Sequence, residues 1–206
     1  DDMTLLVRAA QAAVQDAGLT MQDIDGLATC SVNASMWPMP VIEHLGINPT
    51  YVDGTMIGGS SFIAHLLPAM RARGAGTIVN ITSMGGKIHT PLGAWYHGTK
   101  FALEAISDCL RMEVEPFGIN VVVVEPGGIK TEWADIAAQK LREVSGEGPY
   151  GHQALPMGES MIGRASRQRQ SPPELIADTI AKAVQTRRPK TRYAVGFGAR
   201  PMIFLR

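Results

Sequence analysis

Three side chains in the middle of the sequence have the types and spacing needed to move a proton. Tyr96 and Lys100 are four residues apart, so on a helix they lie on the same face. A phenol titrates at about pH 10, but an ammonium group within a few ångströms favours the phenolate and lowers the phenol pKa toward neutrality. Ser83 ends a predicted strand, where its hydroxyl can hydrogen-bond an alcohol or carbonyl oxygen. The spacing therefore predicts an acid–base centre made of these three residues.

The hydrophobic pattern predicts alternating helices and strands along the whole chain. Segment 119–128 has an unbroken β-branched run, which suggests a strand buried on both faces. Such alternation predicts an α/β fold with a parallel sheet flanked by helices. Ser83 and the Pro126-Gly127 loop then fall at carboxyl ends of strands, where the sites of parallel sheets lie. The predicted helices are 4–19, 39–47, 61–74, 94–117, 131–144 and 171–186, and the predicted strands are 24–32, 50–54, 76–83, 119–128 and 191–196.

Between residues 145 and 171 the composition changes to Gly, Ser, Pro, Met and Arg, which predicts a loop or lid. We expect Tyr150, Met157 and Met161 within it to form an apolar wall of a substrate pocket. The helix that follows has a favourable start, with Ser171 as N-cap and an acidic residue three positions later. This pattern predicts a capping box at that helix end.

The composition excludes several classes of function. The 206 residues include 19 Lys plus Arg and 19 Asp plus Glu, and this neutral balance gives no support to nucleic-acid binding. No apolar run approaches the roughly 18 residues that suggest a membrane span. Cys30 and Cys109 are far apart and belong to no Cys/His cluster, so we expect no metal site and a reducing, cytoplasmic compartment. The length suits one α/β domain, or a domain and a fragment.

Residues from about 66 to 206 resemble the C-terminal half of the short-chain dehydrogenase/reductase family. The matching segments are LLPAMRARGAGTIVNITSMGG, then YHGTK, then VVVVEPGGIKTEW, at the spacing of the family. The resemblance implies a Rossmann-like fold in which Tyr96 is the catalytic acid/base. It also implies that Lys100 supports the phenolate and binds the cofactor ribose, and that Ser83 orients the substrate. The expected cofactor is NAD or NADP, and the expected substrate is a small alcohol or carbonyl compound.

The segment EPGGIKT contains the family pattern Pro-Gly-x-x-x-Thr, which begins at Pro126 and Gly127. By this resemblance, the backbone of Ile129 and the hydroxyl of Thr131 meet the carboxamide of the nicotinamide. A simpler interpretation is that Pro-Gly only ends the strand and that Thr131 only caps the next helix. Only the first interpretation predicts that this segment binds a ligand, the nicotinamide.

Residues 1–65 lack TGxxxGxG, the cofactor motif of the family's first strand–turn–helix. Instead, AAQAAVQDAGLTMQDIDGLATC and EHLGINPTYVDGTMIGGSSFIAHL resemble the N-terminal part of a thiolase-like protein related to lipid-transfer proteins. Gly58 stands where active thiolases have a nucleophilic cysteine, so Claisen chemistry is not expected. The two resemblances predict a chimera in one continuous α/β layer structure. In it, the thiolase-like residues 1–65 replace the cofactor-binding strands, and residues 66–206 are the dehydrogenase half.

Three functions remain open on the sequence alone. The first is an NAD(P)-dependent oxidoreductase. Its cofactor phosphates could lie on the turn Gly54-x-x-x-Gly58-Gly59, although we favour the simpler interpretation of that turn as a tight connection without a ligand. The second is a catalytically inactive α/β chain that binds partners or homo-oligomerises through the helix 94–117. The third is an acyl-CoA-related remnant in residues 1–65.

Overall fold

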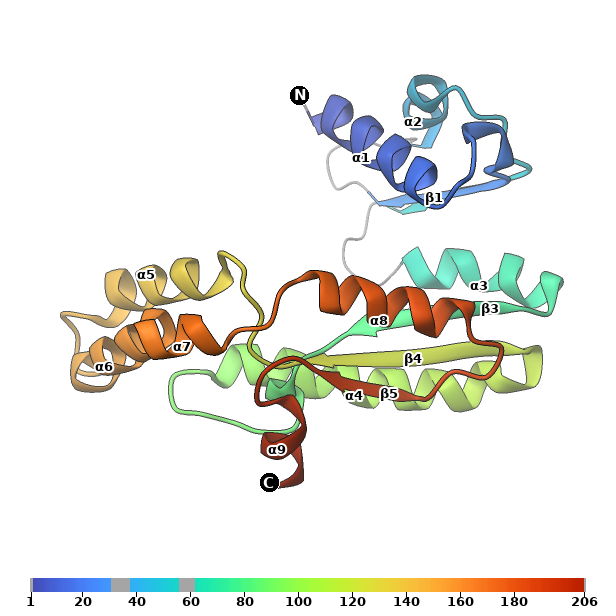
Figure 1. The fold of residues 1–206 in the computed structure, drawn as a ribbon. Coiled ribbons are helices and arrows are strands. Elements are labelled where there is room, and N and C mark those ends of the chain that lie inside the picture. The colour runs from blue at the N-terminus through green and yellow to red at the C-terminus, as the bar shows by residue number, and fades with distance from the viewer. Residues whose placement is uncertain (1, 31–37, 56–61, 206) are drawn as a thin grey trace. The chain divides into compact units, whose positions relative to one another are not determined.

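The computed structural model describes residues 2–30, 38–55 and 62–205 (Figure 1). Residue contacts divide the chain into two compact units, residues 1–74 and 75–206. The first unit contains α1 (Asp2–Asp16), β1 (Gly26–Cys30), α2 (Pro38–Leu45), β2 (Tyr51–Thr55) and α3 (Phe62–Arg73). The second contains β3 (Gly76–Ile81), α4 (Ala94–Val114), β4 (Ile119–Pro126), α5 (Trp133–Ser145), α6 (Gly151–Ile162), α7 (Arg164–Arg169), α8 (Glu174–Gln185), β5 (Arg192–Val195) and α9 (Ala199–Phe204).

The first unit is built on a two-stranded parallel sheet in which β1 and β2 are paired over their whole length. Val41 and Leu45 of α2, together with Ile47, form its buried centre, and Leu6 of α1 packs on them. α1 ends at Asp16, and the predicted glycine cap, Gly18, follows two residues later with a φ of +70°, which favours glycine because an L side chain is strained there.

The second unit contains a three-stranded parallel sheet in the order β3-β4-β5. Its register aligns Val79 with Val122 and Val124 with Tyr193. The central strand β4 is buried along 121–124, as its run of valines predicts. α4 and α8 lie on opposite sides of this sheet and both contact β4 (Figure 1). The parallel α/β arrangement confirms the predicted fold class.

The predicted loop at 145–171 is wrong, because most of it is helical in α6 and α7. Gly and Pro are poor helix formers, which is why their enrichment predicted a loop. In the structure, however, Ala154 and Gly158 are buried where α6 packs on α5. A Cβ at Gly158 would lie 3.5 Å from the carbonyl oxygen of Ala138, so small residues let the two helices approach closely. Here the small residues serve helix packing.

The predicted capping box at Ser171 is also wrong. α8 begins at Glu174 with Pro173 as N-cap, and no side chain caps it. The backbone of Ser171 is instead engaged in a parallel bridge with Ile129. A contact over such a long sequence distance leaves no local pattern in the sequence.

The structure also shows how the chain is divided between the two sheets. β2 belongs to the first sheet and β3 to the second, and the two compact units divide after Gly74. The origin and the boundary assigned to residues 1–65 stay predictions. The glycine turn that begins at Gly54 continues into residues 56–61, which lie outside the described residues. Over the described ranges, no helix is long and apolar enough to cross a membrane and no cluster of ligands suits a metal ion. Cys109 is an exposed free thiol, and the cytoplasmic location stays a prediction.

Candidate active site

α4 brings Tyr96 and Lys100 onto one face, as their spacing predicts. The Lys100 ammonium lies 5.9 Å from the centre of the Tyr96 ring and donates a hydrogen bond of 3.1 Å to the carbonyl oxygen of Ile81 in β3. Burial lowers the pKa of the Lys100 ammonium, because removal from water disfavours the charged form. A cation anchored beside the ring supplies a positive potential near the phenol.

Ser83 lies where β3 ends and begins a short 3-10 turn, Met84–Gly86, which we call the serine turn. The Ser83 hydroxyl oxygen accepts a hydrogen bond of 3.0 Å from the Gly85 N–H and lies 3.5 Å from the carbonyl oxygen of Pro126. A Cβ at Gly85 would lie 2.9 Å from the Tyr96 ring, so the serine turn packs directly against the tyrosine. The structure therefore brings Ser83, Tyr96 and Lys100 together at the carboxyl ends of β3 and β4.

Two aromatic side chains flank the Tyr96 ring. Trp133, at the start of α5, has its ring centre 5.4 Å from that of Tyr96. The buried His97 meets the same ring edge-on at 5.5 Å. Its Nε2 accepts a hydrogen bond from the Thr90 N–H at 3.1 Å, so its Nδ1 carries the proton and donates to the Gly85 carbonyl at 2.8 Å. His97 thus ties the serine turn to α4, a role that no spacing in the sequence indicates.

The Pro126–Thr131 segment is clamped by backbone hydrogen bonds. The Gly127 N–H donates to the Val195 carbonyl and the Gly128 N–H to the Phe197 carbonyl, each at 2.8 Å. Ser171 donates to the Gly128 carbonyl at 2.9 Å and accepts from the Lys130 N–H at 2.8 Å. Between these bonds, the Ile129 N–H has no partner within the described part of the chain. The segment therefore presents one backbone donor that a ligand could use.

The Thr131 hydroxyl accepts a long hydrogen bond of 3.4 Å from the Trp133 N–H at the start of α5. This contact fits the simpler interpretation of Thr131, in which it supports the helix end. It leaves the hydroxyl proton and a lone pair for a ligand. Both interpretations of Thr131 are therefore compatible with its position.

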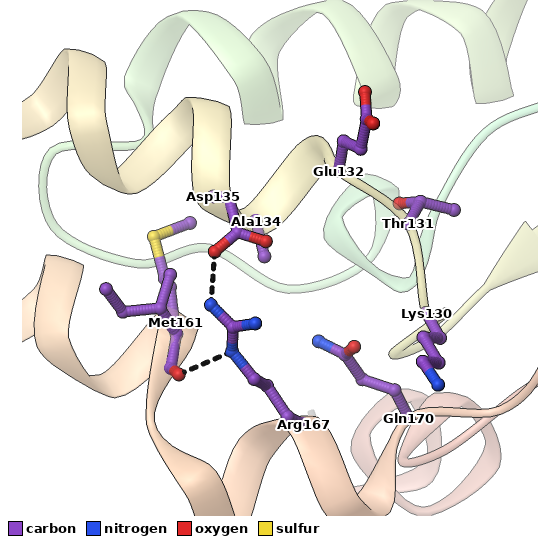
Figure 2. Close-up of a pocket in the computed structure, with 9 residues that line it drawn as sticks. Lys130, Thr131, Glu132, Ala134, Asp135, Met161, Arg167 and Gln170 are labelled. Atoms are coloured by element: carbon purple, nitrogen blue, oxygen red, sulfur yellow. Dashed lines mark hydrogen bonds and ion pairs between the residues drawn. The ribbon is translucent and has the colours of Figure 1, made fainter.

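A pocket adjoins this segment and lies between it, α5 and the helices α6 and α7 (Figure 2). Arg167 is held in it by Asp135 at 2.5 Å and by the Ile162 carbonyl at 2.9 Å. Of the three side chains expected to form an apolar wall, only Met161 lines this pocket, and Tyr150 and Met157 do not. Four charged residues contribute to the lining, which consists of Lys130, Thr131, Glu132, Ala134, Asp135, Met161, Ile162, Arg167 and Gln170.

These contacts define an α/β protein of Rossmann-like fold with a serine, a tyrosine and a lysine gathered at the carboxyl edge of a parallel sheet. The family model described as short chain dehydrogenase matches residues 2–141, and this chain belongs to that family.

Named relatives agree with this assignment. The uncharacterized oxidoreductase YbbO of Escherichia coli K12 is 37% identical over 158 residues, which are 77% of this chain and 53% of the relative. An uncharacterized oxidoreductase of Schizosaccharomyces pombe is 31% identical over 143 residues, 68% of this chain and 57% of the relative. A crystal structure of a short-chain dehydrogenase from Streptomyces avermitilis matches with a TM-score of 0.56 and 25% identity, covering 96% of this chain and 68% of that one. The chain thus spans about half the length of the curated relatives it matches.

The family match begins at residue 2 and so includes most of the segment for which we predicted another origin. The comparisons give the thiolase-like resemblance of residues 1–65 no support, and they support neither an inactive chimera nor an acyl-CoA-related remnant. The assignment to one family therefore rests on a match across both units.

Proposed function

We propose that this chain is an NAD(P)-dependent oxidoreductase acting on a small alcohol or carbonyl compound, with Tyr96 as its acid/base. The observation that carries the proposal is the convergence of the Ser83 hydroxyl, the Tyr96 ring and the Lys100 ammonium around the serine turn. A substrate oxygen between the Ser83 and Tyr96 hydroxyls could be held by one and protonated by the other. The Lys100 cation would favour the phenolate that remains.

The cofactor would be held by the Pro126–Thr131 segment. Its residues fit the group, because the unpartnered Ile129 N–H and the Thr131 hydroxyl are a donor and a donor/acceptor suited to a carboxamide. Gly127 keeps this segment close to its neighbours, since a Cβ there would collide with the backbone of Phe197. When bound, the nicotinamide would supply the hydride chemistry, which no side chain of the chain can supply. The chain's own residues would bind and orient the substrate and the cofactor, and they would exchange the proton with the substrate oxygen.

Titration of the purified chain with NADH and with NADPH, followed by nicotinamide fluorescence, tests the proposal. We expect saturable binding that Thr131→Val weakens by about 2–10-fold, because one hydrogen bond contributes about 0.5–1.5 kcal/mol. Thr186→Val is the matched control, since that exposed threonine bonds only its own helix at the end of α8 and should leave binding unchanged. Absence of binding at millimolar concentrations of both cofactors would contradict the proposal.

We also propose that the chain self-associates through α4. Trp95 and Ile106 lie eleven residues apart, about three helical turns, so they share one face of this helix, and they are 91% and 54% exposed. A second copy of the same helix face would cover them. We expect sedimentation equilibrium to give a dimer or larger assembly for the wild type and a smaller mass for Ile106→Glu. A monomeric wild type, or an unchanged mass in the variant, would contradict this.

A further inference from the structure

A buried carboxylate on α4, Glu104, lies beneath the candidate active site. Its exposure is 4%, and Glu125 at the end of β4 is 3% exposed. Ionised carboxylates are rarely removed from water unless cations and hydrogen bonds compensate them. Two acids buried side by side therefore need an explanation in the contacts they make.

The contacts of Glu104 come from three different segments. Its Oε1 accepts a hydrogen bond of 2.5 Å from the Thr82 hydroxyl. Its Oε2 lies 2.8 Å from the Lys87 ammonium and 3.1 Å from two nitrogens of the Arg192 guanidinium. The same two cations lie 3.9 Å and 3.6 Å from Glu125. Two acids and two bases thus form a charge-balanced group, which we call the Glu104 network.

The partners of Glu104 lie at both ends of the serine turn. Thr82 comes immediately before Ser83, and Lys87 comes immediately after the turn Met84–Gly86. Gly86 packs on the same helix, because a Cβ there would lie 3.1 Å both from Glu104 Cγ and from the Lys100 carbonyl oxygen. Glu104 is also one helical turn beyond Lys100. The Glu104 side chain therefore holds the serine turn at one position along the axis of α4.

We propose that Glu104 is a positioning residue whose carboxylate sets the distance of Ser83 from Tyr96 and Lys100. This inference rests on the proposed function, because its consequence is the alignment of the groups that meet the substrate oxygen. Misplacement of a reacting group by about 1 Å can cost roughly 10²-fold in rate. Glu104→Gln has nearly the same shape but no charge, so it can no longer hold the Lys87 and Arg192 cations together.

Asp108 provides a matched control on the same helix. It binds the same Arg192 guanidinium, with both carboxylate oxygens at 2.7 Å, and Arg111 at 2.5 Å. None of its contacts within the described residues reaches the serine turn. Asp108→Asn should therefore weaken the fold without moving Ser83.

We expect both variants to unfold at lower denaturant concentration, but only Glu104→Gln to lower kcat, by about 10–100-fold, with the Kd of the cofactor unchanged. The reaction to follow is NADH- or NADPH-dependent reduction of a panel of small aldehydes and ketones. Thr82→Val removes the hydroxyl that lies 2.5 Å from Glu104 Oε1 and 3.2 Å from the Val124 carbonyl oxygen, but it leaves both cations paired and should give a smaller loss of kcat. This variant keeps the test valid if Glu104→Gln does not fold. Equal kcat losses in the Glu104 and Asp108 variants would overturn the proposal.

A second measurement needs no turnover. The chain is labelled with 3-fluorotyrosine and the ¹⁹F resonance of Tyr96 is identified from its loss in Tyr96→Phe. Because Gly85 of the serine turn touches the Tyr96 ring, displacement of the turn should shift this resonance in Glu104→Gln and leave it in place in Asp108→Asn. If the wild type shows no turnover, the proposed function fails while this measurement still tests the positioning. An unmoved resonance in Glu104→Gln would overturn the positioning even in an active enzyme.

Discussion

Tyr96→Phe should lower kcat by about 10²–10⁴-fold, the usual contribution of a general acid or base, and leave the fold intact. The change removes only the hydroxyl, and within the described residues this hydroxyl has no hydrogen-bond partner. The ring keeps its contacts with Trp133, His97 and Gly85. The free energy of unfolding should therefore change by no more than about 0.5 kcal/mol.

The measurement pairs steady-state turnover with chemical denaturation of the same preparation. Tyr150→Phe is the control, because Tyr150 is an exposed tyrosine at the start of α6 and lines neither the site nor the pocket. Turnover that survives in Tyr96→Phe would show that another group moves the proton. If Tyr96→Phe loses its folded structure together with turnover, the loss of turnover follows from unfolding and the catalytic role of Tyr96 loses its support.

Gly127→Ala should destabilise the second unit by about 1–3 kcal/mol or more and weaken cofactor binding. A Cβ at this position would collide with the Phe197 carbonyl oxygen and lie 2.8 Å from the Ala199 nitrogen. Both are backbone atoms, which cannot turn aside as a side chain can. The same Phe197 carbonyl accepts the hydrogen bond of the Gly128 N–H, so moving it loosens the segment that holds Ile129.

The neighbouring glycine offers a close comparison. A Cβ at Gly128 would approach Phe197 no closer than 3.7 Å, an ordinary contact. Gly128→Ala should therefore change stability and cofactor Kd much less than Gly127→Ala does, as denaturation and fluorescence titration of both variants would show. Similar losses in the two variants would mean that chain flexibility, and not the close approach, is what the glycine at 127 provides.

Local patterns in the sequence predicted the features that depend on near neighbours. The valines of β4 indicated a strand buried on both faces, and the spacing of Tyr96 and Lys100 indicated a shared helix face. Ser83 could be assigned to the same edge because parallel strands end together. These predictions need only the periodicity of a helix or a strand.

The rest depends on contacts between distant segments. Gly158 belongs to a segment whose composition favours a loop, but in the structure it packs against α5. No local pattern marks Glu104 as buried, and its burial is compensated by Thr82, Lys87 and Arg192. His97 has no partner at helical spacing, yet its proton is fixed by Thr90, which lies outside α4, and by Gly85 of the serine turn. No window of sequence contains both partners of such contacts together with the geometry that joins them.

The bridge between Ile129 and Ser171 joins the two ends of a long segment of the chain, which contains α5, α6 and α7. Most of the residues that line the pocket belong to that segment, whereas Ser83, Tyr96 and Lys100 belong to α4 and to the end of the sheet. Because the ends already meet, the segment between them can change in length and composition at little entropic cost to the sheet. The architecture thus keeps the three candidate site residues on the sheet and α4, and it leaves the helices around the pocket free to diverge as a separate module.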